Sequence, residues 1–191
     1  MVKATSGRAL FSAHDGAYVL KLTGDVRVPM CATLDKFIEG MFEDSALNAV
    51  VIDLSETQVI DSTALGLLAK IAIYYDKKFH SKPLLLSPNE DITRILLSMG
   101  FPQVFDLREE GLSSRPAMVA VPRIKCSEDN ACEKVLEAHR ILMGMNDSNR
   151  EIFKDVVQAL EEASQQSVSA AECDCAAAEK VVSDSLVARP Q

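Results

Sequence analysis

The sequence predicts a mixed α/β domain: a mixed sheet with an N-terminal hairpin and helices packed on it, plus a C-terminal extension of two helices. Three observations support this prediction. Over residues 8–110 the period at which apolar residues recur alternates between about 2 and about 3.6 residues, as in strands that alternate with helices. An Asp-Gly turn separates the first two strand-like segments. Beyond residue 126, two helical patterns follow each other with no strand between them.

The first half of the domain is predicted to hold two strands, a helix and a third strand. Residues 8–13 and 17–24 flank the turn at residues 14–16 and should pair as an antiparallel hairpin. A helix begins after Pro29. One of its faces is apolar and carries Met30, Leu34, Phe37, Ile38 and Met41. The mostly apolar run 47–54 indicates a central strand covered on both faces.

The second half of the domain is predicted to alternate helices and strands. Residues 62–79 form a helix with an apolar face, and the run 83–87 forms a fourth strand. Asn89 supplies cap chemistry for a short helix that ends at Gly100, and residues 104–107 form a last edge strand. The resulting β-α-β units require right-handed crossovers and mostly parallel neighbours.

The C-terminal part differs from the domain in composition and in the pattern of its apolar residues. Residues 111–126, with Pro116 and Pro122, are predicted to be a linker, and residues 164–191 a flexible tail of small and polar residues. Residues 127–163 form two amphipathic helices, which cannot bury their apolar stripes in isolation. We expect a helical hairpin that packs on the domain, on a second copy in a homodimer, or on a partner.

The composition excludes several classes of ligand. The 191 residues include 20 Lys and Arg against 28 Asp and Glu, a net charge of −8, so direct binding to nucleic acid or to an acidic membrane lacks its electrostatic driving force. Aromatic residues make up 5% and Trp is absent, which argues against stacking platforms for carbohydrate or single strands. No stretch approaches the roughly 18–20 apolar residues of a membrane span, and the first residues do not resemble a signal peptide. We expect a cytoplasmic module that binds proteins.

Cysteine and histidine give no support to a metal, a cofactor or catalysis. The five cysteines form an odd set typical of reduced thiols, and the one close pair, Cys173 and Cys175, offers two ligands where structural zinc needs four. His14, His80 and His139 do not lie in a motif with a nucleophile, and we interpret His139 as an ordinary surface or packing residue. Common nucleotide-binding and hydrolase motifs are absent. We therefore expect a protein that is not an enzyme.

The most informative segment is Ile60-Asp61-Ser62-Thr63-Ala64-Leu65-Gly66, where a buried strand leads into a helix. Asp61 and Ser62 are both good N-cap residues, so one interpretation is a capped helix and nothing more. The other is a regulatory phosphorylation site at Ser62, because a phosphoserine adds about −1.5 to −2 charges and is favoured at a helix N-terminus. The residues alone leave both interpretations open.

The span from about Leu10 to Leu107 resembles a STAS domain of the bacterial anti-sigma factor antagonist family. The segment 52–55, Ile-Asp-Leu-Ser, resembles the strand before the family's switch loop, and the segment 60–66 resembles its phosphorylation motif. Gly100-Phe101 and Val104-Phe105 resemble the C-terminal end of the family's domain. The predicted STAS domain is residues 8–110.

The resemblance implies a phosphorylation site and a set of partners. Ser62 would be phosphorylated by a serine kinase that is itself an anti-sigma factor, and a PP2C-type phosphatase would reverse the modification. Asp61 would help to present the hydroxyl, and Thr63 would be a second or alternative acceptor. Ala64 stands where the family often has Gly. Asp61, Ser62, Thr63 and Ala64 would form the partner-binding surface, which binds the regulator when unphosphorylated and releases it on phosphorylation.

Other STAS proteins imply two non-enzymatic alternatives. One is the STAS subunit of a lipid-trafficking ABC transporter complex, and the other is a scaffold in a stress-signalling assembly. A gene for a serine kinase or PP2C phosphatase nearby would favour the antagonist, whereas neighbouring permease and ATPase genes would favour the transporter subunit.

Overall fold

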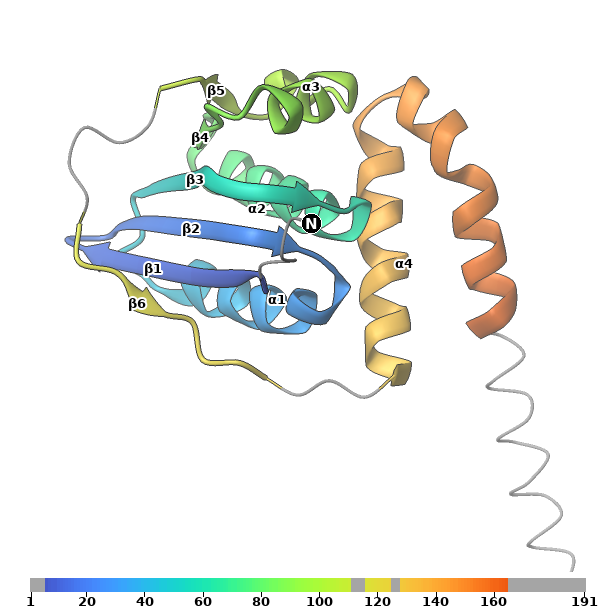
Figure 1. Ribbon diagram of the computed structural model, residues 1–191, viewed down its shortest axis with the longest axis horizontal. Coiled ribbons are helices and arrows are strands. Elements are labelled where there is room, and N and C mark those ends of the chain that lie inside the picture. The colour runs from blue at the N-terminus through green and yellow to red at the C-terminus, as the bar shows by residue number, and fades with distance from the viewer. Residues whose placement is uncertain (1–5, 111–115, 125–127, 165–191) are drawn as a thin grey trace, which may run out of the picture.

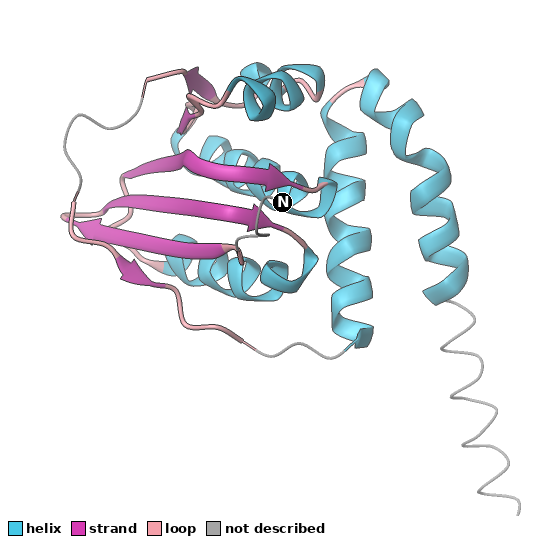
Figure 2. Ribbon diagram, viewed as in Figure 1, coloured by secondary structure: helices cyan, strands magenta, loops and turns pink. Residues whose placement is uncertain are grey.

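The protein, described from a computed structural model over residues 6–110, 116–124 and 128–164, is a six-stranded mixed sheet with helices packed on it (Figures 1 and 2). The strands lie in the order β5-β4-β3-β2-β1-β6. The elements are β1 (Arg8–His14), β2 (Ala17–Val26), α1 (Val28–Glu43), β3 (Ala49–Ile60), α2 (Ser62–Phe79), β4 (Leu84–Leu86), α3 (Glu90–Ser98), a short 3-10 helix (Phe101–Gln103), β5 (Asp106–Arg108), β6 (Val119–Ala120) and α4 (Glu128–Met145), followed by a helix over residues 147–164. The predicted fold class is confirmed. None of the helices described is long and apolar enough to span a membrane.

The N-terminal hairpin forms as the Asp-Gly turn predicts. β1 and β2 pair antiparallel from Arg8 opposite Thr23 to His14 opposite Ala17, and Asp15 and Gly16 both have positive φ, as the two central residues of a tight hairpin turn require. From β2 onward, the strands β2, β3, β4 and β5 pair parallel, as the β-α-β units predict. The carboxyl ends of β2 and β3 therefore lie at the same edge of the sheet.

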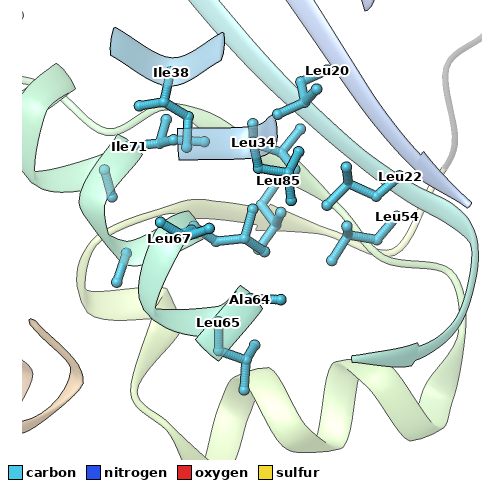
Figure 3. Close-up of a cluster of buried hydrophobic side chains, with 14 of the residues drawn as sticks. Leu20, Leu22, Leu34, Ile38, Leu54, Ala64, Leu65, Leu67, Ile71 and Leu85 are labelled. Atoms are coloured by element: carbon cyan, nitrogen blue, oxygen red, sulfur yellow. The ribbon is translucent and has the colours of Figure 1, made fainter. Parts of the chain in front are cut away.

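The core lies between the sheet and helices α1 and α2. In Figure 3, leucine and isoleucine side chains from the strands meet those of both helices, and each is at most 1% exposed: Leu20, Leu22, Leu34, Ile38, Leu54, Leu67, Ile71 and Leu85. Burial of a side chain of this size contributes roughly 1.5–3 kcal/mol. This packing fixes α2 on the sheet and with it the position of Ser62.

The third strand is longer than the sequence predicts. Residues 49–60 form β3, whereas the apolar run predicts 47–54. Ser55 and Glu56 break the apolar pattern, but the strand continues because β2 holds it, with Thr23 opposite Glu56 and Val26 opposite Ile60. Register shifts in this stretch accommodate the polar residues. Backbone pairing with a neighbouring strand outweighs the local pattern here.

The last predicted strand is shifted. We expected residues 104–107, but β5 is Asp106–Arg108 and is preceded by the 3-10 helix Phe101–Gln103. Gly100 adopts the left-handed conformation at the start of that helix, and Phe101 and Phe105 stack in the core. These aromatic anchors, rather than strand pairing, set the path of the chain.

The segment predicted to be a linker contains an edge strand. Within 111–126, Val119–Ala120 form β6, which pairs antiparallel with β1, and the Val121 amide donates to the Ala9 carbonyl at 2.9 Å. Arg123 donates to the Gly7 carbonyl at 3.0 Å. The predicted linker thus contains a short strand, because the outer edge of β1 offers backbone groups that this segment satisfies.

The two C-terminal helices, α4 and 147–164, are called here the helical pair. Helix α4 packs on the domain, which is one of the three arrangements that the sequence left open, and the second helix contacts α4 through Phe153 against His139. Figure 1 shows α4 standing across the end of the sheet where β2 and β3 finish, in contact with α1 and α2. Its apolar stripe is buried there, with Ala138 and Leu142 fully buried. Residues 165–191 of the predicted tail, including Cys173 and Cys175, lie outside the described residues.

Candidate regulatory site at Ser62

Ser62 is the first residue of α2 and lies at the carboxyl edge of the parallel strands. The loops that leave β2 and β3 are tied together at this edge. The Asp61 amide donates to the Val26 carbonyl at 3.1 Å, and the Val28 amide, at the start of α1, donates to Asp61 Oδ2 at 2.8 Å. In open α/β sheets this edge is where binding sites usually form. The topology thus places Ser62 at the edge of the sheet where such sites form.

Asp61, and not Ser62, caps α2. Asp61 Oδ1 accepts the Ala64 amide at 2.8 Å while Oδ2 accepts the Val28 amide, and Asp61 has the extended backbone of an N-cap residue. The side chain of Ser62 is therefore not used to satisfy the helix end. Its hydroxyl is half-buried beside the first turn of an 18-residue helix, where the positive end of the helix dipole favours negative charge.

An Asp61→Ala variant is expected to lose about 1–2 kcal/mol of unfolding free energy, since two backbone amides lose their acceptor. Asp61→Asn retains an acceptor oxygen and serves as the matched control. Denaturant titration of the two variants measures the difference. Equal midpoints for Asp61→Ala and the wild-type protein would show that the cap contributes nothing.

The four residues of the predicted partner surface differ in exposure. Asp61 and Ser62 are half-buried, whereas Thr63 is 2% and Ala64 1% exposed, because both face the interior from the first turn of α2. Ser62 is thus the more accessible of the two candidate acceptor hydroxyls, and Thr63 is not presented at the surface.

His139 of α4 contacts the Ser62 hydroxyl directly. Its Nε2 lies 2.9 Å from Ser62 Oγ, and its Nδ1 lies 2.7 Å from the Val135 carbonyl oxygen. A carbonyl oxygen only accepts, so Nδ1 carries the hydrogen, and in the neutral ring Nε2 accepts a hydrogen bond from the Ser62 hydroxyl. The imidazole is 5% exposed and packs edge-on against Phe153. The hydroxyl of the candidate site is therefore held by the C-terminal extension.

Sequence reasoning missed this role of His139. The prediction of an ordinary surface or packing residue is half right, because the ring is packed, but it also binds Ser62 across 77 positions of sequence. One signal was available: His139 follows Val135 by four residues and so lies on the apolar stripe of α4 with Ala138 and Leu142. A polar side chain on a buried stripe requires a hydrogen-bond partner within the protein.

The backbone of α4 approaches α2 directly at Gly66. A Cβ atom at this position would overlap the Ala138 carbonyl oxygen and Cα. Only glycine permits this approach, which brings α4 close enough for His139 to reach Ser62. The Gly of the sequence motif thus has a packing function in this chain.

Replacing Gly66 by alanine is expected to lower the unfolding free energy by up to about 2 kcal/mol, since overpacking costs about 1–3 kcal/mol and the higher helix propensity of alanine offsets about 1 kcal/mol. Gly40→Ala in α1 is the control, because nothing lies within 4 Å of its added Cβ, and it should stabilise by about 0.5–1 kcal/mol. Hydrogen exchange of α4 amides should accelerate only in Gly66→Ala. Unchanged exchange there would contradict close packing.

A cluster of buried ion pairs joins α1, α2 and α4 at Lys70, about two helical turns after Ser62. Lys70 of α2 donates to Asp35 of α1 at 2.7 Å and to Glu137 of α4 at 2.8 Å, and Lys134 of α4 also pairs with Asp35. Asp35 and Lys70 are buried. Each charge has an opposite partner, as burial requires.

The cluster holds its members in their charged forms. Burial raises the pKa of the Asp35 carboxyl, but hydrogen bonds from Lys134 and Lys70 outweigh burial and keep that pKa below its ordinary value. Burial lowers the pKa of Lys70, and its hydrogen bonds to Asp35 and Glu137 outweigh burial and raise it. The attachment of α4 is thus electrostatic as well as apolar.

Acid is expected to weaken this attachment. The folded-state pKa of Asp35 lies below its unfolded value of about 3.9, so its stabilising contribution is complete above that pH and is lost as the pH falls through the folded pKa. Stability should therefore fall more steeply from about pH 4 downward in the wild-type protein than in Asp35→Asn. Denaturant midpoints at several pH values measure both slopes, and parallel slopes would contradict the assignment.

Within the described part of the chain, the remaining histidines and cysteines do not gather at a site. Among the residues that the structure describes, no group of three or more His, Cys, Asp or Glu side chains could hold a metal ion. Cys31 is buried in α1, and burial, followed by nearby Asp61 and Asp35, raises the pKa of its thiol to about 12. Cys132 is exposed on α4.

The mixed sheet, the capped helix and Ser62 at its first position form an α/β domain whose family is shown by comparison with known families. The sequence matches the STAS domain over residues 9–110, so the chain belongs to the STAS domain family. No curated protein matches the chain.

Proposed function

We propose that this chain is an anti-sigma factor antagonist that acts by partner switching. With Ser62 unphosphorylated, it binds an anti-sigma factor or related serine kinase regulator through the surface around Asp61 and Ser62. Phosphorylation of Ser62 by that kinase releases the regulator, and a PP2C-type phosphatase restores binding. In this proposal the chain works in the cytoplasm and carries out no chemical transformation itself.

One observation carries the proposal: Asp61 performs the capping, so the Ser62 hydroxyl at the N-terminus of α2 is not needed to complete the helix. A phosphate there faces the positive end of the helix dipole, so the domain itself can tolerate it. The surrounding surface changes by about −1.5 to −2 charges next to the Asp61 carboxylate. Phosphorylation would therefore alter recognition by a partner and leave the fold of the STAS domain itself intact.

The size of the effect is sufficient for a regulatory response. A doubly charged group placed against an acidic or desolvated interface costs several kcal/mol, and every 1.4 kcal/mol changes affinity about tenfold. A single modification can thus convert a bound partner into a free one at constant protein concentration.

The test begins with an affinity pull-down from the native host, with full-length Ser62→Ala as bait and Ser62→Asp as the matched control. Phosphosite mapping of the wild-type protein follows. We expect a kinase-type regulator to be enriched on Ser62→Ala over Ser62→Asp, and the phosphate to map to Ser62. Equal recovery on both baits, or phosphate at other positions only, would refute the proposal.

The alternatives remain distinguishable by their partners. Recovery of a permease and an ATPase would identify a transporter subunit, and recovery of several STAS proteins would identify a scaffold. Homodimerisation through the helical pair stays a prediction, which sedimentation of the full chain tests. Of the second helix, Phe153 and Val157 are buried on this chain, whereas Ile152 and Val156 are exposed and available to a second copy.

A further inference from the structure

The helical pair covers the surface on which the proposed function depends. His139 occupies the hydrogen-bonding position at Ser62 Oγ, and one turn further along α2 the Ala138 backbone lies against Gly66. A second turn further, Glu137 bonds to Lys70. Three points spaced along one side of α2 are thus occupied by a single turn of α4.

The helical pair is also anchored away from Ser62. At the turn between its helices, Asn149 Nδ2 donates to the Met99 carbonyl at 3.0 Å and to the Leu142 carbonyl at 3.1 Å, and Asn146 Nδ2 donates to Met99 at 3.3 Å. Met99 follows α3, so this anchor ties the turn to the domain. The turn is therefore held to the domain by contacts that are separate from those at Ser62 and Lys70.

We propose that α4 is an intramolecular ligand of the Ser62 surface, and that a kinase or partner that binds this surface must displace it. This inference rests on the proposed function for the identity of the partner. The contacts of α4 define what the partner needs. It must present a small residue over Gly66, a hydrogen-bonding group toward Ser62 and an acidic side chain toward Lys70, as α4 does.

The same geometry links phosphorylation to the position of α4. With 2.9 Å between Ser62 Oγ and His139 Nε2, a phosphorus atom and its oxygens do not fit between these two atoms. Modification of Ser62 therefore breaks the contact with His139, through movement of the imidazole or of the Ser62 side chain. A protein phosphorylated at Ser62 is expected to hold α4 less closely than the unmodified protein does.

Thiol labelling of the full chain with N-ethylmaleimide tests whether α4 covers the Ser62 surface, and it needs no partner protein. This arrangement is called the cover below. A Ser62→Cys variant places a reporter thiol at the covered position, and peptide mass spectrometry follows each cysteine separately. Cys132, exposed on α4, is the internal reference, and buried Cys31 reports unfolding. The reporter thiol should react at least about tenfold more slowly than Cys132, as expected of a position that opens only transiently.

Two substitutions in α4 should displace this helix from the Ser62 surface, and a third should not. Glu137→Lys places a cation beside Lys70 and Lys134, and Ala138→Arg places a long side chain against Gly66. Each should accelerate the labelling of the reporter thiol several-fold while Cys31 stays protected. Glu133→Lys makes the same charge change at an exposed position of the same helix and should leave the rate unchanged.

The outcomes separate this inference from the proposed function. If the reporter thiol reacts as fast as Cys132 in the Ser62→Cys parent, or if neither opening variant accelerates its labelling, the cover is refuted whatever the partner. If the cover is confirmed, Glu137→Lys should bind the regulator from the pull-down several-fold more tightly than the wild-type protein. If Ser62→Ala and Ser62→Asp bind that regulator equally, the proposed function fails while the cover stands.

Discussion

Replacing Asp35 by asparagine is expected to lower the unfolding free energy by roughly 3–5 kcal/mol, the effect of breaking a buried ion pair. Asp35 is 2% exposed and pairs with both Lys70 and Lys134, so without its charge two cations share the carboxylate of Glu137. Asparagine has nearly the same volume, and therefore the loss is one of charge and not of packing. Denaturant unfolding measures it.

The matched control for Asp35→Asn is Asp91→Asn. Asp91 pairs with Arg94 at 3.4 Å, and both side chains are at least 76% exposed. The same chemical change there should cost at most about 1 kcal/mol, since exposed pairs contribute little. A loss of similar size in the two variants would mean that the buried cluster adds nothing to the attachment of α4.

Ser62→Asp is expected to weaken binding to the captured regulator at least tenfold relative to Ser62→Ala, which corresponds to about 1.4 kcal/mol or more. The reason is a negative charge at the centre of the proposed contact surface. Calorimetric titration of the same regulator with each full-length variant measures the ratio.

The control for this titration is Ser81→Asp. Ser81 is an exposed serine just beyond the opposite end of α2, which as an 18-residue helix is about 27 Å long. It adds the same charge away from Ser62 and should leave affinity within about twofold of the wild-type protein, since charges beyond a Debye length are screened. Equal weakening by Ser81→Asp and Ser62→Asp would assign the effect to net charge instead of position.

Much of the domain follows from local patterns. The helix predicted over residues 62–79 has those bounds in the structure, because Asp61 supplies the cap and the apolar face is continuous. The hairpin follows from its Asp-Gly turn. Where long-range pairing decides, the patterns fail: β3 extends through polar residues because β2 holds it, and Val119–Ala120 form a strand because the outer edge of β1 accepts one.

The candidate site was predictable on one side only. The segment from Asp61 to Ala64 carries its own signals of a helix start, so its place at the sheet edge follows from the sequence. The contribution of α4 did not follow, because the match of Gly66 to Ala138 and of His139 to Ser62 depends on how two distant helices pack. An amphipathic stripe predicts that a helix packs, but not on which surface.

The most direct test of the central claim uses the modification itself. Full-length protein phosphorylated at Ser62 and the same protein after treatment with a PP2C-type phosphatase are titrated against the regulator captured by Ser62→Ala. We predict that the phosphorylated form binds at least tenfold more weakly and that dephosphorylation restores the affinity of the unmodified chain. Equal affinity of the two forms would contradict the account.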